Sequence, residues 1–111
     1  MADPGFEIEI MRDDDVSAVV AVVGELDLAT APTLSDALGR VAHRPGKTVR
    51  VDMERVGFLD SSGISALVEE QKRRAEAGGR LVLHRASDQV VRVLEISGLG
   101  TFFELSPDAP S

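Results

Sequence analysis

Residues 58–63 read Phe-Leu-Asp-Ser-Ser-Gly, and this segment joins an expected strand to an expected helix. Before it, apolar and polar residues alternate over residues 49–54, which is typical of a strand. After it, apolar residues recur at helical spacing until a pair of glycines at residues 78–79, a common helix end. The apolar positions of this helix are Ile64, Leu67, Val68 and Ala75. The segment therefore predicts a strand, a turn and a helix that begins at Asp60 or Ser61.

The chain before this segment is expected to form a hairpin and a first helix. Residues 6–10 alternate between apolar and acidic, whereas residues 16–23 form a β-branched apolar run suited to a strand buried on both faces. Residues 24–27 should break that second strand. Thr30 and Pro32 are typical of a helix cap and a first helical turn, so we expect a helix to begin there.

Helical and extended patterns alternate through the rest of the chain as well. The remaining expectations are an end to the first helix at Pro45-Gly46, a strand at residues 81–83, a third helix from Ser87 to Gly98 and a last short strand or turn at Phe102 and Phe103. Strands separated by helices predict parallel pairing through right-handed crossovers. The sequence therefore predicts an α/β fold with a mixed, mostly parallel sheet of four to five strands, an N-terminal hairpin and three or more helices.

Length and composition favour one domain without a bound cofactor. The chain has 111 residues, and we expect an extension at residues 1–5, a domain at residues 6–105 and a frayed tail at residues 106–111. It contains no cysteine, so disulfides, thiolate metal sites and cysteine nucleophiles are excluded. Two histidines, His43 and His84, do not make a metal site by themselves.

Charge and hydropathy bear on the partners and on the location of the protein. The net charge is −7, whereas nucleic-acid binders normally carry a clustered basic surface, so direct DNA or RNA binding is not expected. The short basic run at residues 72–74 is interpreted as a solvated helix face. The longest apolar run is far shorter than the roughly 20 residues of a membrane-spanning helix, and the first residues do not resemble a secretory signal. We therefore expect a cytoplasmic protein without membrane insertion.

A functional site is expected where the parallel strands end. In open α/β sheets such sites lie beyond the carboxyl ends of the strands, here at residues 24–30, 54–63 and 84–87. The second segment carries two hydroxyls next to Asp60, in the first turn of a helix whose free N–H groups attract anions. A phosphate on one of these serines would suit that position. The alternative is that these residues only cap the helix, and the residues alone favour capping.

Four motifs then resemble the STAS domain of anti-sigma factor antagonists. They are Gly-Glu-Leu-Asp at residues 24–27, Leu34 in the first helix, Asp-Ser-Ser-Gly at residues 60–63 and Ser-Gly-Leu at residues 97–99. The resemblance covers residues 6–105, and Asp-Ser-Ser-Gly between a strand and a helix is its most specific part. It implies the STAS fold and a regulatory protein that is not an enzyme.

The resemblance also implies a partner switch that controls transcription. In that family the unmodified antagonist binds an anti-sigma factor with serine-kinase activity, which then releases its sigma factor. The kinase uses ATP to phosphorylate the first serine after the aspartate, and a phosphoserine phosphatase reverses the step. By motif the phosphorylated residue is Ser61. The expected partner-binding residues are Glu25, Asp27, Asp60, Ser61, Ser62 and Gly63, in a protein expected to be a monomer.

Two other functions remain as alternatives. A serine hydrolase would need a base beside Ser61 or Ser62, and the nucleophile-elbow pattern Gly-x-Ser-x-Gly is absent. His84 is therefore interpreted as structural, and His43 as a favourable charge at the end of the first helix. The second alternative is a STAS module that docks on a transporter or a stress-signalling complex, which the architecture alone does not separate from a sigma-factor switch.

Overall fold

The computed structural model describes residues 5–110, so residues 1–4 of the expected N-terminal extension and Ser111 of the expected tail lie outside it. The described part of the chain forms five strands and three helices. In chain order they are β1 (Glu7–Asp13), β2 (Ser17–Leu26), α1 (Ala31–Gly39), β3 (Thr48–Leu59), α2 (Ser61–Glu76), β4 (Arg80–His84), α3 (Asp88–Ile96) and β5 (Glu104–Ser106). None of these helices is both long enough and apolar enough to cross a bilayer.

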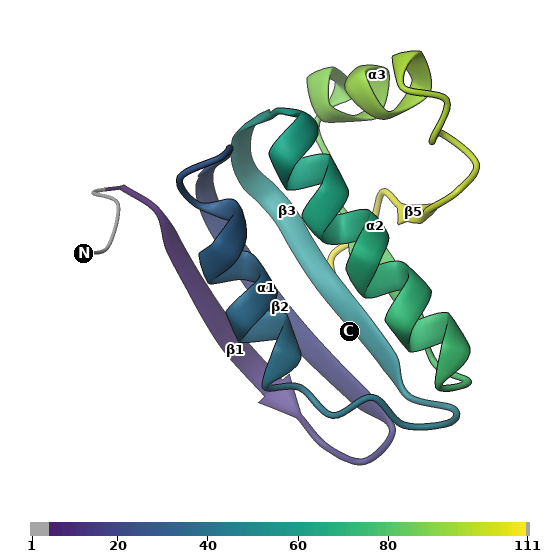
Figure 1. Cartoon of the computed structure of the whole chain (residues 1–111). Helices are drawn as coiled ribbons and strands as arrows, with labels where there is room; N and C mark the ends of the chain where they lie inside the picture. Colours follow the sequence, from purple (N-terminus) through teal and green to yellow (C-terminus); the bar gives the residue numbers. More distant parts are fainter. Residues whose placement is uncertain (1–4, 111) are drawn as a thin grey trace.

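The strands form a single sheet in the order β1-β2-β3-β4-β5. β1 pairs with β2 antiparallel, and every other pair is parallel. This topology confirms the predicted fold class. α1 and α2 lie side by side on one face of the sheet, while α3 lies beyond the end at which α2 begins (Figure 1).

The core lies between the sheet and the helices. Inward side chains of β2 and β3 alternate with more exposed ones, as the period of a strand requires. Leu34 and Leu38 of α1 and Leu67 of α2 are fully buried against them. Burying a leucine of this kind stabilises the fold by roughly 1.5–3 kcal/mol. This packing holds both helices on the sheet.

β2 continues through the glycine that was expected to end it. Gly24 has a φ of 115°, and a Cβ there would lie 2.7 Å from the Gly5 carbonyl oxygen, so only glycine fits. The register shifts between Gly24 and Glu25, and pairing then resumes up to Leu26. The prediction of a strand break at residues 24–27 is therefore wrong, because a bulge absorbs the irregularity and the strand goes on.

α1 ends earlier than predicted, and a buried arginine binds the carbonyl groups at and after its end. The helix ends at Gly39, well before Pro45-Gly46. The Arg74 guanidinium donates to the carbonyl of Leu38 at 2.8 Å, of Val41 at 3.0 Å and of Ala42 at 2.9 Å. These bonds satisfy backbone acceptors that a helix end otherwise leaves without partners.

Two interpretations of charged residues are corrected by this contact. Arg74 is only 1% exposed, so the basic run at residues 72–74 is not wholly a solvated face. Its side chain lies 2.8 Å from Oε1 of Glu70, which is also buried, and burial lowers the Arg74 pKa while Glu70 opposes that shift. His43 contacts Glu70 at 2.8 Å and does not belong to α1. Arg74 lies seven residues after the buried Leu67 and so on the same helix face, but a charged side chain there gave no sequence signal of burial.

The expected tail packs against the domain up to Asp108. Ser106 is the last residue of β5, and its carbonyl accepts from the Arg85 N–H at 2.8 Å. His84 Nδ1 lies 2.8 Å from the Asp108 carbonyl oxygen. Ser106 and Asp108 of the expected tail therefore contact β4.

Replacement of Arg74 by methionine should lower the free energy of unfolding by about 3–5 kcal/mol, because Glu70 would stay buried without its ion pair to the guanidinium. Urea denaturation measures the change. Lys72→Met is the matched control, since Lys72 is exposed on the same helix and its loss should change stability by no more than about 0.5 kcal/mol. Equal effects of the two substitutions would contradict the role assigned to Arg74.

Candidate functional site

The site is built where β2 and β3 end next to each other. Leu26 and Leu59 are paired as the last residues of these strands, and the Asp60 N–H donates to the Leu26 carbonyl at 3.0 Å. The two following loops therefore leave the same edge of the sheet. Asp27 and Asp60, the first residues after the strands, lie at this edge together.

Asp60 is the N-cap residue of α2. Its Oδ1 accepts from the N–H of Ser62 at 2.8 Å and of Gly63 at 3.1 Å, while its carbonyl accepts from the Ile64 N–H at 2.9 Å. Two of the N–H groups that could have bound an anion are therefore already occupied by a carboxylate. The expectation of an open anion site at this helix end is wrong, because Asp60 supplies the negative charge itself.

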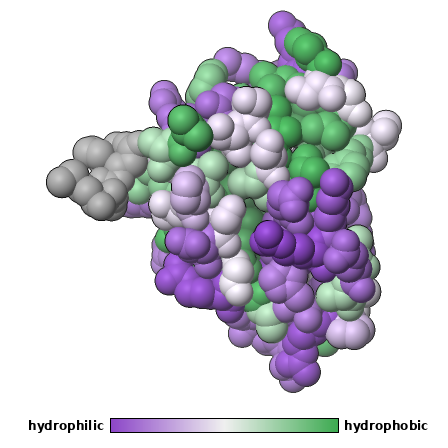
Figure 2. All heavy atoms as spheres, in the orientation of Figure 1, coloured by the Kyte–Doolittle hydropathy of each residue, from purple (hydrophilic) through white to green (hydrophobic). Residues whose placement is uncertain are grey.

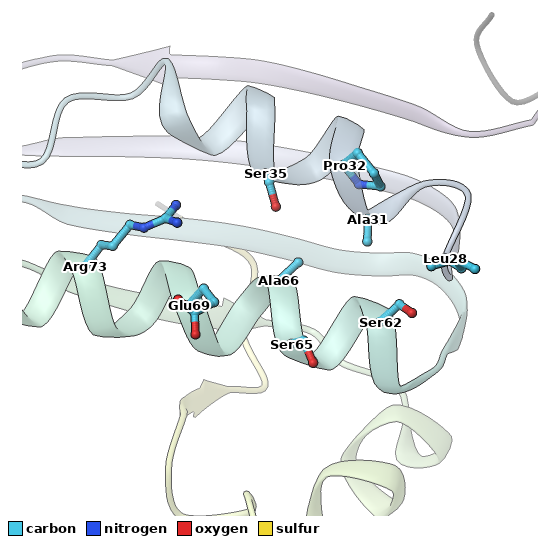
Figure 3. A pocket seen from close by; sticks show the side chains of 9 residues that line it. All are labelled: Leu28, Ala31, Pro32, Ser35, Ser62, Ser65, Ala66, Glu69 and Arg73. Carbon is cyan, nitrogen blue, oxygen red and sulfur yellow. The ribbon is translucent and has the colours of Figure 1, made fainter.

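Ser61 and Ser62, by contrast, differ in their surroundings. Ser61 is the first residue of α2, is exposed, and makes no hydrogen bond through its hydroxyl to any described residue. Ser62 is half-buried and faces the space between α1 and α2 (Figure 3). Asp60 alone caps the helix, so capping does not account for the Ser61 hydroxyl.

Gly63 lets α2 approach the end of β2. A Cβ at this position would lie 2.7 Å from Leu59 Cδ1 and 2.8 Å from both the Cβ and the carbonyl oxygen of Leu26. Real Cβ atoms do not come this close to other atoms, and Leu26 contributes backbone as well as side chain. Gly63 is thus required for packing between the two loops.

Asp27 holds the loop that precedes α1. Its carboxylate accepts from the N–H of Ala29 at 3.0 Å and of Thr30 at 3.2 Å, and its carbonyl accepts from the Ala31 N–H at 2.8 Å. Thr30 was predicted to cap α1, but its side chain makes no cap bond; it donates to the Glu25 carbonyl at 2.6 Å. Thr30 therefore occupies the predicted cap position of α1, but its hydroxyl is engaged with β2 and does not bind the first turn of the helix.

Leu28 is a feature that the sequence analysis missed. It lies between Asp27 and Ala29 in this hydrogen-bonded loop, and the residue is 77% exposed. An isolated leucine in a loop gives no periodic signal, so only the structure shows that it stands beside α2. It lies at the Ser62 end of a groove between α1 and α2 (Figure 3).

Comparisons with known proteins agree with this geometry. The family described as "Mlab, STAS domain" matches residues 11–106. The chain belongs to the STAS domain family. An anti-sigma-B factor antagonist of Listeria monocytogenes is 34% identical over 88% of this chain and 86% of its own length.

Two solved structures are similar over nearly the whole STAS domain. One is an anti-sigma factor antagonist from Mycobacterium paratuberculosis, with a TM-score of 0.76 and 29% identity over 97% of this chain and 92% of its own. The other is the anti-sigma factor antagonist SpoIIAA in its unphosphorylated form, with a TM-score of 0.67 and 25% identity over 93% of this chain and 89% of its own. The similar proteins are regulatory antagonists rather than enzymes.

The two histidines of this STAS domain are engaged elsewhere in the fold. His84 is buried in β4 beside the Asp108 carbonyl, and His43 contacts Glu70. Within residues 5–110 neither histidine makes a hydrogen bond to Ser61 or Ser62. The geometry therefore gives neither serine the base that a hydrolase nucleophile needs.

The third expected segment of the STAS domain, residues 84–87, is occupied by ion pairs. Arg85 has a φ of 54° and reaches back to Asp52 and Glu54 of β3. Partial burial by itself would raise the pKa of the Asp52 carboxyl, but hydrogen bonds from Arg85 and the Glu54 N–H outweigh burial and lower that pKa. These charges are paired with one another, so the candidate site of this STAS domain consists of the other two segments.

Gly63→Ala should destabilise the STAS domain by about 1–3 kcal/mol, because the added methyl overlaps Leu26 and Leu59. Thermal or urea unfolding gives the change. Gly57→Ala serves as its control, since no atom lies within 4 Å of a Cβ at that position. A Gly63→Ala protein as stable as the control would show that the close approach at the α2 start is not a constraint.

Ser61→Ala should change the free energy of unfolding by no more than about 0.5 kcal/mol, as expected for an exposed side chain without hydrogen bonds. Calorimetric unfolding of the purified protein provides the measurement. A loss of several kcal/mol would assign Ser61 a structural role and weaken its interpretation as a functional residue.

Proposed function

We propose that this STAS domain is an anti-sigma factor antagonist whose binding is switched off by phosphorylation of Ser61. The unphosphorylated form binds an anti-sigma factor with serine-kinase activity and so frees the sigma factor for transcription. The observation that carries the proposal is the Ser61 hydroxyl, which is exposed and makes no hydrogen bond within residues 5–110, next to a helix cap that Asp60 completes without it. The names of the related proteins support the same role.

The proposed partner-binding surface comprises Glu25, Asp27, Asp60, Ser61, Ser62 and Gly63. Glu25 is exposed at the end of β2, and Asp27 and Asp60 hold the two loops in shape. Gly63 acts through packing, since it is buried beneath Ser61 and Ser62. In this proposal Ser61 accepts the phosphoryl group, while its neighbours present it in a fixed position.

The effect of a phosphate on the free protein should be small. A phosphoserine adds about 1.5–2 negative charges at pH 7. In water, two unit charges 4 Å apart interact by about 1 kcal/mol, so repulsion by Asp60 is of that order. The positive end of the α2 dipole offsets part of it, by about 0.3–1 kcal/mol. The phosphorylated domain should therefore remain folded.

The effect on a complex should be much larger. Contact with a partner displaces water, and at an effective dielectric of 20 the same pair of charges interacts by about 4 kcal/mol. Moving a binding equilibrium from nearly all bound to nearly all free requires about 5.5 kcal/mol. Repulsion by Asp60, desolvation of the phosphate and its bulk together reach that magnitude. The switch then lies in the interface and not in the fold.

The proposal also includes the enzymes that modify Ser61, the oligomeric state and the location of the protein. The kinase transfers the γ-phosphoryl group of ATP to Ser61 Oγ, and a phosphoserine phosphatase removes it by hydrolysis. The protein acts as a monomer in the cytoplasm, without direct contact to nucleic acid. Recovery of an anti-sigma kinase from cell extract supports this function, whereas recovery of a transporter subunit in its place contradicts it.

The three forms of residue 61 should rank clearly in affinity for the anti-sigma kinase. Unmodified protein and Ser61→Ala should bind with similar affinity, because alanine adds no charge to the surface. Ser61→Asp should bind at least about tenfold more weakly, a loss of 1.4 kcal/mol, because it places a second carboxylate beside Asp60. Titration calorimetry with the purified kinase measures all three.

Phosphorylation itself supplies the control for this ranking. With kinase and ATP, mass analysis of peptides should find one phosphate, on Ser61, and none on Ser61→Ala protein. Equal affinities of the three proteins, or a phosphate confined to Ser62, would overturn the proposed mechanism.

A further inference from the structure

β1 lies at an edge of the sheet, away from the hydrophobic surface around the proposed switch. On the helix side of the domain, hydrophobic surface gathers toward the upper end, where α2 begins, and hydrophilic surface dominates the lower end (Figure 2). β1 pairs only with β2, and it has seven residues, whereas β5 at the other edge has three (Figure 1). The backbone N–H and C=O groups that β1 directs away from β2 therefore lack a strand partner within residues 5–110.

The two faces of β1 differ in chemistry. Ile8 and Ile10 pair with buried valines of β2, so they lie on the side of the sheet that α1 and α2 cover. Ile8 packs against the core, whereas Ile10 is 37% exposed. Glu7 and Glu9 alternate with the isoleucines and therefore lie on the opposite side. A strand laid along β1 would meet an apolar side chain on one face and carboxylates on the other.

A groove of about 330 Å³ beside the two glutamates carries an excess of negative charge. Its charged lining residues are four acids and two arginines, namely Glu7, Glu9, Asp52, Glu54, Arg55 and Arg85. Arg85 is paired with Asp52 and Glu54. Neither Glu7 nor Glu9 makes an ion pair with any residue from 5 to 110. Arg55 thus remains as one cation beside two unpaired carboxylates, and the face attracts basic groups.

We propose that β1 is an interaction edge that takes up an extended segment of a partner protein in which basic and apolar side chains alternate. The segment adds to the sheet as a further strand and satisfies the outward backbone groups of β1. Its basic side chains lie opposite Glu7 and Glu9, while its apolar side chains cover Ile10. The inference goes beyond the proposed switch, because it uses none of the partner-binding residues assigned there.

A bulge sets the length of the segment that fits. The register of β1 shifts between Ile10 and Arg12, so regular pairing covers Glu7–Ile10. A bulge of this kind twists an edge strand and discourages the long, flat pairing that leads to aggregation. The partner segment therefore needs only the length of Glu7–Ile10, and a contact this short should be reversible.

A second copy of this chain is a poorer occupant of the edge. Each copy carries a net charge of −7, so two copies repel each other. Antiparallel pairing of two β1 strands about Ile8 would also place Glu7 of one copy opposite Glu9 of the other. Like charges directly opposite each other destabilise a sheet. A segment with lysine or arginine at these positions is attracted by the same carboxylates.

Cyclic hairpin peptides, whose outer strands are preorganised, test the edge. A peptide that alternates lysine and valine along its outer strand should shift the amide NMR signals of residues 7–12 of the wild-type protein and slow the exchange of those amides. Glu7→Lys/Glu9→Lys should bind this peptide about tenfold more weakly, because both cross-strand attractions become repulsions. The same variant should bind a peptide with glutamate in place of lysine.

Glu69→Lys/Glu76→Lys is the matched control, because it changes the net charge equally at two exposed positions of α2. Exposed charges far from the peptide are screened at physiological salt, so the control should keep the wild-type Kd for the lysine peptide within about twofold. Thermal unfolding of both variants verifies that they are folded.

An N-methylated form of the lysine peptide separates strand addition from charge attraction alone. Methyl groups on the outward N–H groups of its outer strand remove hydrogen-bond donors but keep every charge, so its Kd should be about tenfold higher. Equal binding of the two peptides, equal loss of binding in the control variant, or unchanged β1 amides in the wild-type protein would each overturn the inference. A wild-type dimer by sedimentation with protected β1 amides would overturn it in favour of a second copy. None of these outcomes involves Ser61, so the proposed switch is tested separately.

Discussion

The parallel pairing of β2 with β3 at their last residues is the constraint on which the site depends. Leu26 and Leu59 end the two strands in register, and the Asp60 N–H to Leu26 carbonyl bond carries the contact one residue further. Gly63 permits this proximity, because a side chain there would overlap both leucines. A shift of one residue in this register would turn the inward leucines outward and separate the two loops.

α1 is held at both ends by polar groups from other parts of the chain. Asp27 binds the N–H groups at its start, and Arg74 binds the carbonyl groups at its end from within α2. Both helices are therefore fixed relative to the sheet and to each other. The groove between them is lined by Ser62, the neighbour of Ser61. Rigidity of this kind suits a protein whose proposed switch is a change of charge at one exposed atom.

Much of this arrangement could be predicted from the sequence, because it follows local rules. The alternating and helical patterns predicted all the main elements, and the order of strands and helices predicted a mostly parallel sheet. The resemblance on Asp-Ser-Ser-Gly identified the family. Several of the failures depend on contacts between residues that are distant in the sequence. The bulge at Gly24, the carbonyl partners of the buried Arg74 and the position of Leu28 beside α2 depend on packing that a local pattern does not contain.

The central claim is that phosphorylation acts on the interface while the fold stays as it is. Amide hydrogen exchange of the unmodified and Ser61-phosphorylated proteins, followed residue by residue by NMR, tests it most directly. We expect changes in exchange only near the site, at residues 26–31 and 59–66, with the protection of β3 and of the rest of α2 unchanged. Loss of protection along the whole of α2 or in the central strands would contradict the claim, because the phosphate would then disable binding by unfolding the domain.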